Sequence, residues 1–376
     1  MADPHPSADA SIAPATSLTP TATSQTLADA APSEERSAAA TPWDWRPASA
    51  SVVASSVSLL ELRGPDSLRF LHGQTSQAIE LARPGQWLST CCITPTARLR
   101  ALAEVLVTQD GAWLVIREGE GAGVRQALDR VLFPADAVEL GPLSEGVLLE
   151  PVPGAGDAVQ AASSGTAPEA AGSAESGLPD WRPLEGGQGF WLGDALVLVG
   201  SDADAAAPGG LEPAAQVLLA RPRLEAERRE RWRIQQGWPA CPAEVNEDTN
   251  PFELGLAPRV SLSKGCYVGQ ETLAKLATYD GVRRQLRRWF VPGAEGPSPG
   301  APLRAGEERA GVVTSALDLA DGSGWIGLAL VRRSALDAAT LVAEREGAEP
   351  LTLQLSLPEA FVAPPVGAGG AGRPAG

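Results

Sequence analysis

Residues 264–271 have the sequence Lys264-Gly265-Cys266-Tyr267-Val268-Gly269-Gln270-Glu271, the densest cluster of chemically distinctive residues in the chain. The two glycines permit backbone conformations that other residues resist. The composition of residues 270–278 predicts a helix, so Cys266 is expected just before a helix N-terminus and beside Lys264. Both neighbours stabilise a thiolate relative to a thiol. Cys266 is therefore a candidate nucleophile, redox-responsive thiol or soft metal ligand, and a buried structural cysteine is the alternative.

Hydrophobic spacing and turn residues predict the elements on either side of this segment. A helix at 223–236 is expected to begin after Pro222 and to end before Gly237. A second helix is expected at 123–133, and Leu68, Leu71, Thr75 and Ile79 recur at helical spacing. Upstream strands are predicted at 57–62, 87–93, 99–108, 112–117, 146–151 and 191–200. Downstream strands at 285–291, 310–317, 325–331, 340–344 and 351–357 predict a small barrel or sandwich.

The chain of 376 residues carries a net charge of −16, which argues against broad binding to nucleic acid. Its basic residues are concentrated in 221–233 and 275–288, where a small anionic ligand could be attracted. No window approaches the roughly 18 consecutive apolar residues of a membrane helix. The sequence therefore predicts a soluble protein with no membrane partner and no general affinity for nucleic acid.

Cysteine and histidine usage limits the kinds of site that this chain can build. The four cysteines, Cys91, Cys92, Cys241 and Cys266, match no zinc or cluster spacing, and adjacent Cys91 and Cys92 are expected to face opposite sides of a strand. The two histidines are too few for a histidine-rich metal site and make a Ser-His-Asp triad improbable. We expect no resident metal and a reducing, cytoplasmic location.

Composition also divides the chain into segments. Residues 1–48 and 363–376 are rich in small residues and Pro and are predicted to be disordered tails. Residues 153–180 are a low-complexity insertion. The ordered part is then an α+β region at 49–280 and a barrel at 281–362.

Several segments besides residues 264–271 resemble the folate-binding YgfZ family, relatives of the glycine-cleavage T-protein. The first strand–helix unit resembles the family at 62–66 and 70–75. The Arg-rich helix resembles it at Arg233-Ile234 and its exit at Gly237-Trp238-Pro239. Further likeness lies in 250–256 and in Gly281, Arg283, Arg284 and Leu286. The resemblance covers about residues 52–360, apart from the insertion.

The resemblance implies a fold and a role. The fold is α+β, a three-lobed ring of two α+β lobes and a C-terminal antiparallel β-barrel around a tetrahydrofolate site. The role is that of an accessory protein for iron–sulfur cluster assembly or maintenance, with folate, assembly proteins or client proteins as partners. T-protein relatives instead transfer an aminomethyl-derived one-carbon unit to tetrahydrofolate.

The resemblance also suggests residues for each part of the site. Cys266 and Lys264 would carry the chemistry. Glu244 and Glu253 would read the pterin of tetrahydrofolate or of a one-carbon derivative. Arg233 and Arg283 would bind its anionic tail, because arginine forks pair well with carboxylates, and Trp232 would stack on it.

The chain departs from the family pattern at four positions. Ala78 stands where the transferases have their catalytic Asp, which favours the iron–sulfur branch over aminomethyl transfer and leaves enzymatic activity open. Ala97 replaces Gly in a Pro-x-Gly-Arg turn. Arg229 stands where close relatives have Trp, so stacking would shift to Trp232. Lys275 replaces an Arg. A tRNA-modification role is a further alternative, suggested by the Arg-rich segments.

Overall fold

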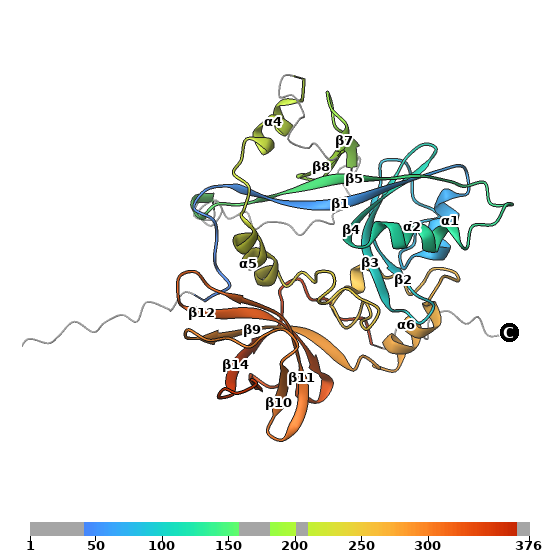
Figure 1. Cartoon of the computed structure of the whole chain (residues 1–376). Coiled ribbons are helices and arrows are strands. Elements are labelled where there is room, and N and C mark those ends of the chain that lie inside the picture. The colour runs from blue at the N-terminus through green and yellow to red at the C-terminus, as the bar shows by residue number, and fades with distance from the viewer. Residues whose placement is uncertain (1–40, 158–180, 201–209, 367–376) are drawn as a thin grey trace, which may run out of the picture. The chain divides into compact units, whose positions relative to one another are not determined.

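The strands of the N-terminal half form one eight-stranded antiparallel sheet, in the order β2-β3-β4-β1-β5-β8-β7-β6. In the computed structural model, which describes residues 41–157, 181–200 and 210–366, the sheet dominates the upper part of Figure 1. The 13-residue strand β1 lies in the middle of the sheet and pairs with β4 on one side and with β5 on the other. The strands are β1 Ser51–Arg63, β2 Trp87–Ile93, β3 Leu99–Val107, β4 Gly111–Gly119, β5 Glu139–Val152, β6 Trp181–Pro183, β7 Gly189–Leu192 and β8 Ala195–Val199.

Two short helices cover one face of this sheet. Helix α1 (Ser67–Gln74) contributes Phe70 and Leu71, and α2 (Gly121–Asp129) contributes Val124 and Leu128, to one buried cluster with the strands. Helix α4 (Pro213–Leu219) packs on the other end of the sheet. As expected for adjacent strand residues, Cys91 and Cys92 enter different buried clusters, one on each face of β2.

The C-terminal strands form a closed six-stranded antiparallel barrel, in the order β10-β11-β12-β9-β14-β13. Trp289 fills its interior, is fully buried and donates its indole N–H to the Leu328 carbonyl at 3.0 Å. A Cβ at Gly327 would lie 2.3 Å from that indole, so glycine is required there. The strands are β9 Arg284–Pro292, β10 Pro302–Ala305, β11 Glu308–Asp318, β12 Gly324–Arg332, β13 Thr340–Ala343 and β14 Leu351–Ser356.

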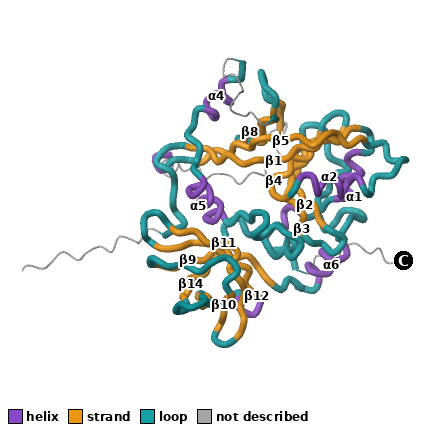
Figure 2. The backbone as a smooth tube through the Cα atoms, in the orientation of Figure 1, coloured by secondary structure: helices purple, strands orange, loops and turns teal. Residues whose placement is uncertain are grey.

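The segment between sheet and barrel contains α5 (Ala226–Gln236), a 3-10 turn η2 (Ala257–Arg259) and α6 (Gln270–Thr278), joined by long loops that Figure 2 shows in teal. A further 3-10 turn, η3 (Arg333–Ala335), follows β12. One buried cluster contains Cys91 from the sheet, Phe252 from the connecting loops and Leu286 from the barrel. The loops therefore link sheet and barrel through a shared hydrophobic core.

The predicted α+β class with a C-terminal antiparallel barrel is confirmed, and α6 has the predicted bounds. Strand β2 also has the predicted bounds, and the other predicted elements are found with shifted ends. Strand β10 was missed, and residues 191–200 form parts of a hairpin, β7–β8. Helix α5 begins three residues later than predicted, because residues 222–224 instead bond to Val52 of β1. Gly237 ends α5 in the left-handed conformation, at φ 73°, as expected for a C-terminal cap.

Residues 1–40 and 367–376 of the predicted disordered tails, and residues 158–180 of the predicted low-complexity insertion, lie outside the described residues. Residues 41–48 were assigned to the N-terminal tail, but Trp43 and Trp45 pack against buried clusters, so the ordered unit begins at Thr41. The sequence missed this because two tryptophans in a Pro-rich stretch produce no hydrophobic period. The proposed boundary at residue 281 stays a prediction. No helix among the described residues is long and apolar enough to cross a bilayer.

Candidate functional site

A cavity of about 640 Å³ lies between α5 and the face of strands β1, β3, β4 and β5. Its helix side is formed by Arg229, Trp232 and Arg233, and Trp238 follows in the loop after α5. Its sheet side includes Arg117, Glu118 and Glu150, and η2 contributes Arg259. The cavity thus combines two indole rings with cations and carboxylates.

Trp232 and Arg233 are the two predicted ligand-binding residues that the structure brings to this cavity. Trp232 is buried and packs with Val53 and Val152. The Arg233 guanidinium is held by Glu230, by the Trp238 carbonyl at 2.7 Å and by Ser315 Oγ at 2.8 Å. Burial alone would lower the pKa of Arg233, but Glu230 and Glu244 raise it above its ordinary value. Arg233 is therefore a fixed, permanently charged wall residue.

Arg259 is anchored on a fully buried carboxylate of β3. Its Nη2 donates to Glu104 Oε1 at 2.8 Å, and Glu104 Oε2 accepts from Trp87 Nε1 at 2.7 Å and from Ser89 Oγ at 2.6 Å. Burial would raise the pKa of Glu104, but Arg259, Arg117 and these hydrogen bonds lower it below its ordinary value. The ionised Glu104 holds Arg259 at the edge of the cavity.

Glu118 is a carboxyl of the cavity wall, and its pKa is shifted in the opposite direction to that of Glu104. It accepts the Cys241 backbone N–H at 2.8 Å. Burial raises its pKa, and the Cys241 amide, Arg233 and Arg117 only partly offset that effect. Glu118 can consequently exchange a proton nearer neutral pH than an ordinary glutamate, as donor or acceptor toward a ligand.

Glu244 lies fully buried and is used inside the protein. Its carboxylate accepts from Ser315 Oγ at 2.7 Å, from the Ala240 backbone N–H at 3.0 Å and from Arg233 Nη1 at 3.3 Å. It does not line the cavity. Its observed contacts position Arg233 and the loop after α5.

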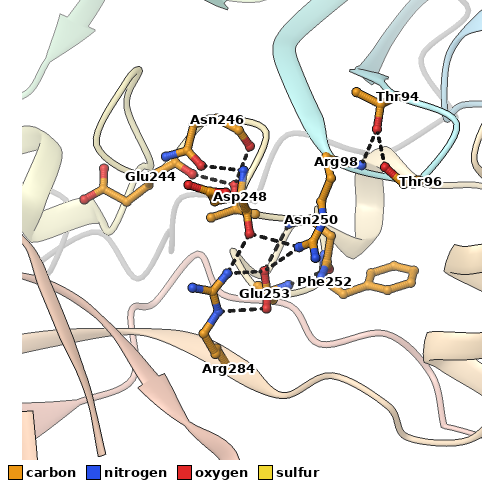
Figure 3. A network of polar contacts seen from close by, with 11 residues as sticks. Thr94, Thr96, Arg98, Glu244, Asn246, Asp248, Asn250, Phe252, Glu253 and Arg284 are labelled. Carbon is orange, nitrogen blue, oxygen red and sulfur yellow. Dashed lines mark hydrogen bonds and ion pairs between the residues drawn. The ribbon is translucent and has the colours of Figure 1, made fainter.

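Glu253 also lies away from the cavity lining, at the junction of sheet, loops and barrel. Arg284 of β9 binds both of its carboxylate oxygens, at 3.0 and 3.1 Å, and Arg98 Nη1 lies 3.9 Å away. Figure 3 shows Arg98 and Arg284 converging on Glu253 and on the Asp248 carbonyl. Arg283, the predicted tail-binding residue, is exposed and lies outside the cavity lining.

Cys266 is exposed and lies four residues before α6, as the sequence predicted, but it is not among the residues that line the cavity. Its loop is fixed to the end of α1: the Val268 backbone N–H donates to the Gly73 carbonyl at 3.0 Å. Gly269 adopts φ 79° and packs on the turn at residues 93–97. The thiol is thus displayed on a loop with fixed ends, and its reactivity stays a prediction.

Lys264 fixes the same loop from the other side. Its buried ammonium lies 4.1 Å from the Tyr267 ring centroid and donates to the carbonyls of His72, Thr75 (2.6 Å) and Gln77 (2.7 Å). Burial lowers the pKa of Lys264 to about 7, whereas three carbonyl acceptors favour the charged form, because an ammonium has three protons to donate. These contacts make Lys264 a structural cross-link, and a catalytic role for it stays a prediction.

The family departures at Ala78 and Ala97 have different structural outcomes. Ala78 is exposed, just beyond α1, and does not line the cavity. Ala97 is fully buried with φ 59°, so the turn keeps the left-handed conformation that a glycine would adopt easily. Thr94 stabilises it, since its Oγ1 accepts the Arg98 backbone N–H at 3.0 Å.

Sequence reasoning missed the sheet side of the cavity, above all Glu118, Arg117 and Arg259. One signal was available: Glu104 interrupts the apolar run of β3, and a charge in such a run is rarely buried without a partner. The partner, Arg259, lies 155 residues away in sequence, so its identity required the fold.

Comparisons with known proteins agree with this architecture. The chain matches no family model. It is 28% identical over 291 residues to a putative transferase, At1g60990, chloroplastic, of Arabidopsis thaliana; the match covers 73% of this chain but only 63% of that protein. It is 38% identical over 101 residues to the tRNA-modifying protein YgfZ of Yersinia enterocolitica, covering 25% of this chain and 30% of the relative.

The fold matches the crystal structure of glycine cleavage system aminomethyltransferase T from Bartonella henselae, with a TM-score of 0.60 and 20% identity over 85% of this chain and 88% of that one. The chain is thus similar in sequence to proteins of the YgfZ type and similar in fold to the T-protein. At 20% identity the T-protein structure supports the family fold and nothing about its chemistry here.

Proposed function

We propose that this protein is a folate-binding accessory protein for iron–sulfur cluster assembly or maintenance. Tetrahydrofolate, or a one-carbon derivative of it, would occupy the cavity beside α5, and the Cys266 thiol would face a protein partner. The observation that supports this most strongly is the cavity itself, because it offers aromatic rings, a carboxyl and arginines within one volume of about 640 Å³.

The cavity's residues fit the parts of a folate. Ligand pockets typically measure about 300–1,000 Å³ and are largely apolar with a few placed polar groups. Trp232 and Trp238 offer surfaces for the pterin and benzoyl rings. Glu118 can pair with the donor edge of a pterin, and Arg229 and Arg233 can bind the carboxylates of the glutamate tail.

This assignment redistributes the roles expected from the sequence. Glu118 takes the pterin-side role that was expected of Glu244 and Glu253, because those two carboxylates are engaged within the protein. Arg229 takes the tail-side role expected of the exposed Arg283, while Arg233 and Trp232 keep theirs. Glu244 then acts on the ligand indirectly, by positioning Arg233.

The exposed position of Cys266 favours a partner over the folate as its target. A stable cluster normally needs four thiolate-type ligands, so one cysteine could only share a cluster with another protein. Within residues 41–157, 181–200 and 210–366, no group of three or more His, Cys, Asp or Glu side chains is arranged to hold a metal ion. We therefore propose a transient contact with cluster-assembly or client proteins, in the cytoplasm.

The test is complementation of cells that lack this protein, with the activity of iron–sulfur enzymes as the readout. Cys266→Ser should abolish rescue while leaving the melting temperature of the purified protein unchanged. Ser263→Ala is the matched control, because Ser263 is exposed in the same loop and does not line the cavity. Normal rescue by the Cys266→Ser variant would refute the thiol role.

Folate-dependent aminomethyl transfer is a second candidate function, and Glu118 is the observation that favours it. Its raised pKa suits proton transfer to or from a bound one-carbon donor, which could substitute for the carboxylate absent at Ala78. Turnover of an aminomethyl donor to methylene-tetrahydrofolate, lost in a Glu118→Gln variant, would support this alternative. No turnover would leave the accessory role.

An RNA-binding role is disfavoured by the net charge of −16, because affinity for nucleic acid depends on cationic groups that neutralise phosphates. Arg231 of α5 is also paired with Asp321, at 3.3 Å. Tight, salt-sensitive binding of tRNA to the purified protein would contradict this view.

A further inference from the structure

Residues Thr41–Pro47, here called the strap, are tied to the rest of the protein by three arginine–tryptophan contacts. The strap's Trp43 lies under Arg288 of β9, with the guanidinium carbon 4.6 Å from a ring centroid. Its Trp45 lies under Arg231 of α5 at 5.2 Å. In the third contact the order reverses, because the strap's Arg46 lies 5.0 Å from a ring centroid of Trp232.

Hydrogen bonds link the same residues to one another. Gln235 of α5 donates from Nε2 to the Trp45 backbone carbonyl at 3.1 Å, and the backbone carbonyl of Gln235 accepts from Arg288 Nη1 at 2.8 Å. The Pro47 carbonyl accepts the Ala155 backbone N–H at 2.9 Å. The strap therefore joins helix, barrel and the segment after β5, and Figure 1 shows the chain before β1 running past α5 toward the barrel.

Trp232 takes part both in the strap contacts and in the cavity lining. Trp232 is among the residues that line the cavity, and Arg46, which contacts its ring, is not. Val53 and Val152 pack on the same side chain. A cation over an indole face restricts how the ring can turn, and a ring already held in place loses less entropy when a ligand stacks on it.

We propose that the strap is a positioning element for the cavity, in which Arg46 holds Trp232 in the orientation that a flat ligand ring stacks against. This inference rests on the proposed folate function. It makes Arg46 a specificity-supporting residue that does not itself touch the ligand.

The test is equilibrium binding of tetrahydrofolate to the purified full-length protein and to three variants. Arg46→Ala should weaken binding about three- to tenfold, the range expected from losing one cation–π contact. Arg46→Lys should stay within about twofold of the wild type, because lysine keeps the cation. Arg182→Ala is the matched control: it removes a similar contact, 5.2 Å from a Trp191 ring centroid, whose partners do not line the cavity.

The melting temperatures of the variants separate positioning from general unfolding. The proposal holds if Arg46→Ala binds more weakly than Arg182→Ala while both remain folded at the assay temperature, and if Arg46→Lys restores affinity. Wild-type affinity in Arg46→Ala, or equal losses in Arg46→Ala and Arg46→Lys, would overturn it. Failure of the wild type itself to bind tetrahydrofolate would overturn the proposed function, and this inference with it.

Discussion

Arg284 of β9 binds the carboxylate of Glu253 with two parallel hydrogen bonds, Nε to Oε1 at 3.0 Å and Nη2 to Oε2 at 3.1 Å. Glu253 is almost fully buried, with 5% of its side chain exposed. The Leu286 backbone N–H also donates to the Glu253 carbonyl at 2.8 Å. This pair therefore fixes the start of the barrel to the loops that follow α5.

Arg284→Ala should lower the free energy of unfolding by about 2–4 kcal/mol, because it leaves a buried carboxylate without its main partner. Arg283→Ala is the control: the neighbouring arginine is exposed, and its removal should change stability by less than about 0.5 kcal/mol. Urea unfolding of both variants measures the difference. Equal stabilities would show that the ion pair does not hold the barrel.

Gly269→Ala should destabilise the Cys266 loop, whereas Gly265→Ala should not. Gly269 has φ 79°, and a Cβ there would lie 2.9 Å from the Thr94 carbonyl oxygen and 2.8 Å from Ile93 Cδ1, so we expect a loss of about 2–4 kcal/mol. A Cβ at Gly265 would meet no atom within 4 Å, and the loss should stay below about 1 kcal/mol. Thermal melts distinguish the two variants, and a stable Gly269→Ala protein would refute the packing described here.

Lys264→Met should cost about 2–4 kcal/mol of stability, because it leaves the carbonyls of His72, Thr75 and Gln77 without their shared donor. Lys275→Met provides the comparison. Lys275 is exposed and pairs with Glu271 four residues earlier on α6, so its loss should cost about 0.5 kcal/mol or less. Similar denaturation midpoints for the two variants would argue against the cross-link.

The protein should become less stable as pH rises above about 9. Burial raises the pKa of Cys91 to about 11 and that of Cys92 to about 12, above the thiol's ordinary value near 8.5. The folded state therefore keeps these protons while the unfolded state releases them, so their stabilising effect is complete below about pH 8.5 and is lost as pH climbs toward 11 and 12.

Urea midpoints between pH 7 and 10.5 measure this effect. A Cys91→Ala/Cys92→Ala variant should show a flatter alkaline decline than the wild type, even if it starts from lower stability at pH 7. Tyr267, whose pKa burial raises to about 12, acts in the same direction and leaves a residual slope. Parallel curves for the wild type and the double variant would show that the buried thiols are not responsible.

Local patterns were enough to predict much of the fold. Strand β2 and helix α6 have the expected bounds, because apolar period and flanking glycines are local signals. Strand β10 was missed because its four residues carry too little pattern. The strap was missed for a related reason: the partners of Trp43 and Trp45 lie on β9 and α5, and they become visible only when the chain is folded.

The site could be predicted less well than the fold, since a cavity is made by residues distant in sequence. Trp232 and Arg233 were found because they sit on a recognisable helix. Arg283 was expected to bind the folate tail, but it is exposed and lies outside the cavity lining, which depends on how β9 begins against the loops. Arg259 belongs to the cavity because η2 folds back onto the sheet, where Arg259 binds Glu104.

The most direct test of the central claim is calorimetric binding of tetrahydrofolate to the purified full-length protein, to Glu118→Ala and Trp238→Ala, and to Arg283→Ala as a control outside the cavity. We expect dissociation constants of about micromolar order for the wild type and for Arg283→Ala, and a loss of about tenfold or more in each cavity variant. No binding by the wild type, or binding that neither cavity variant weakens, would contradict it.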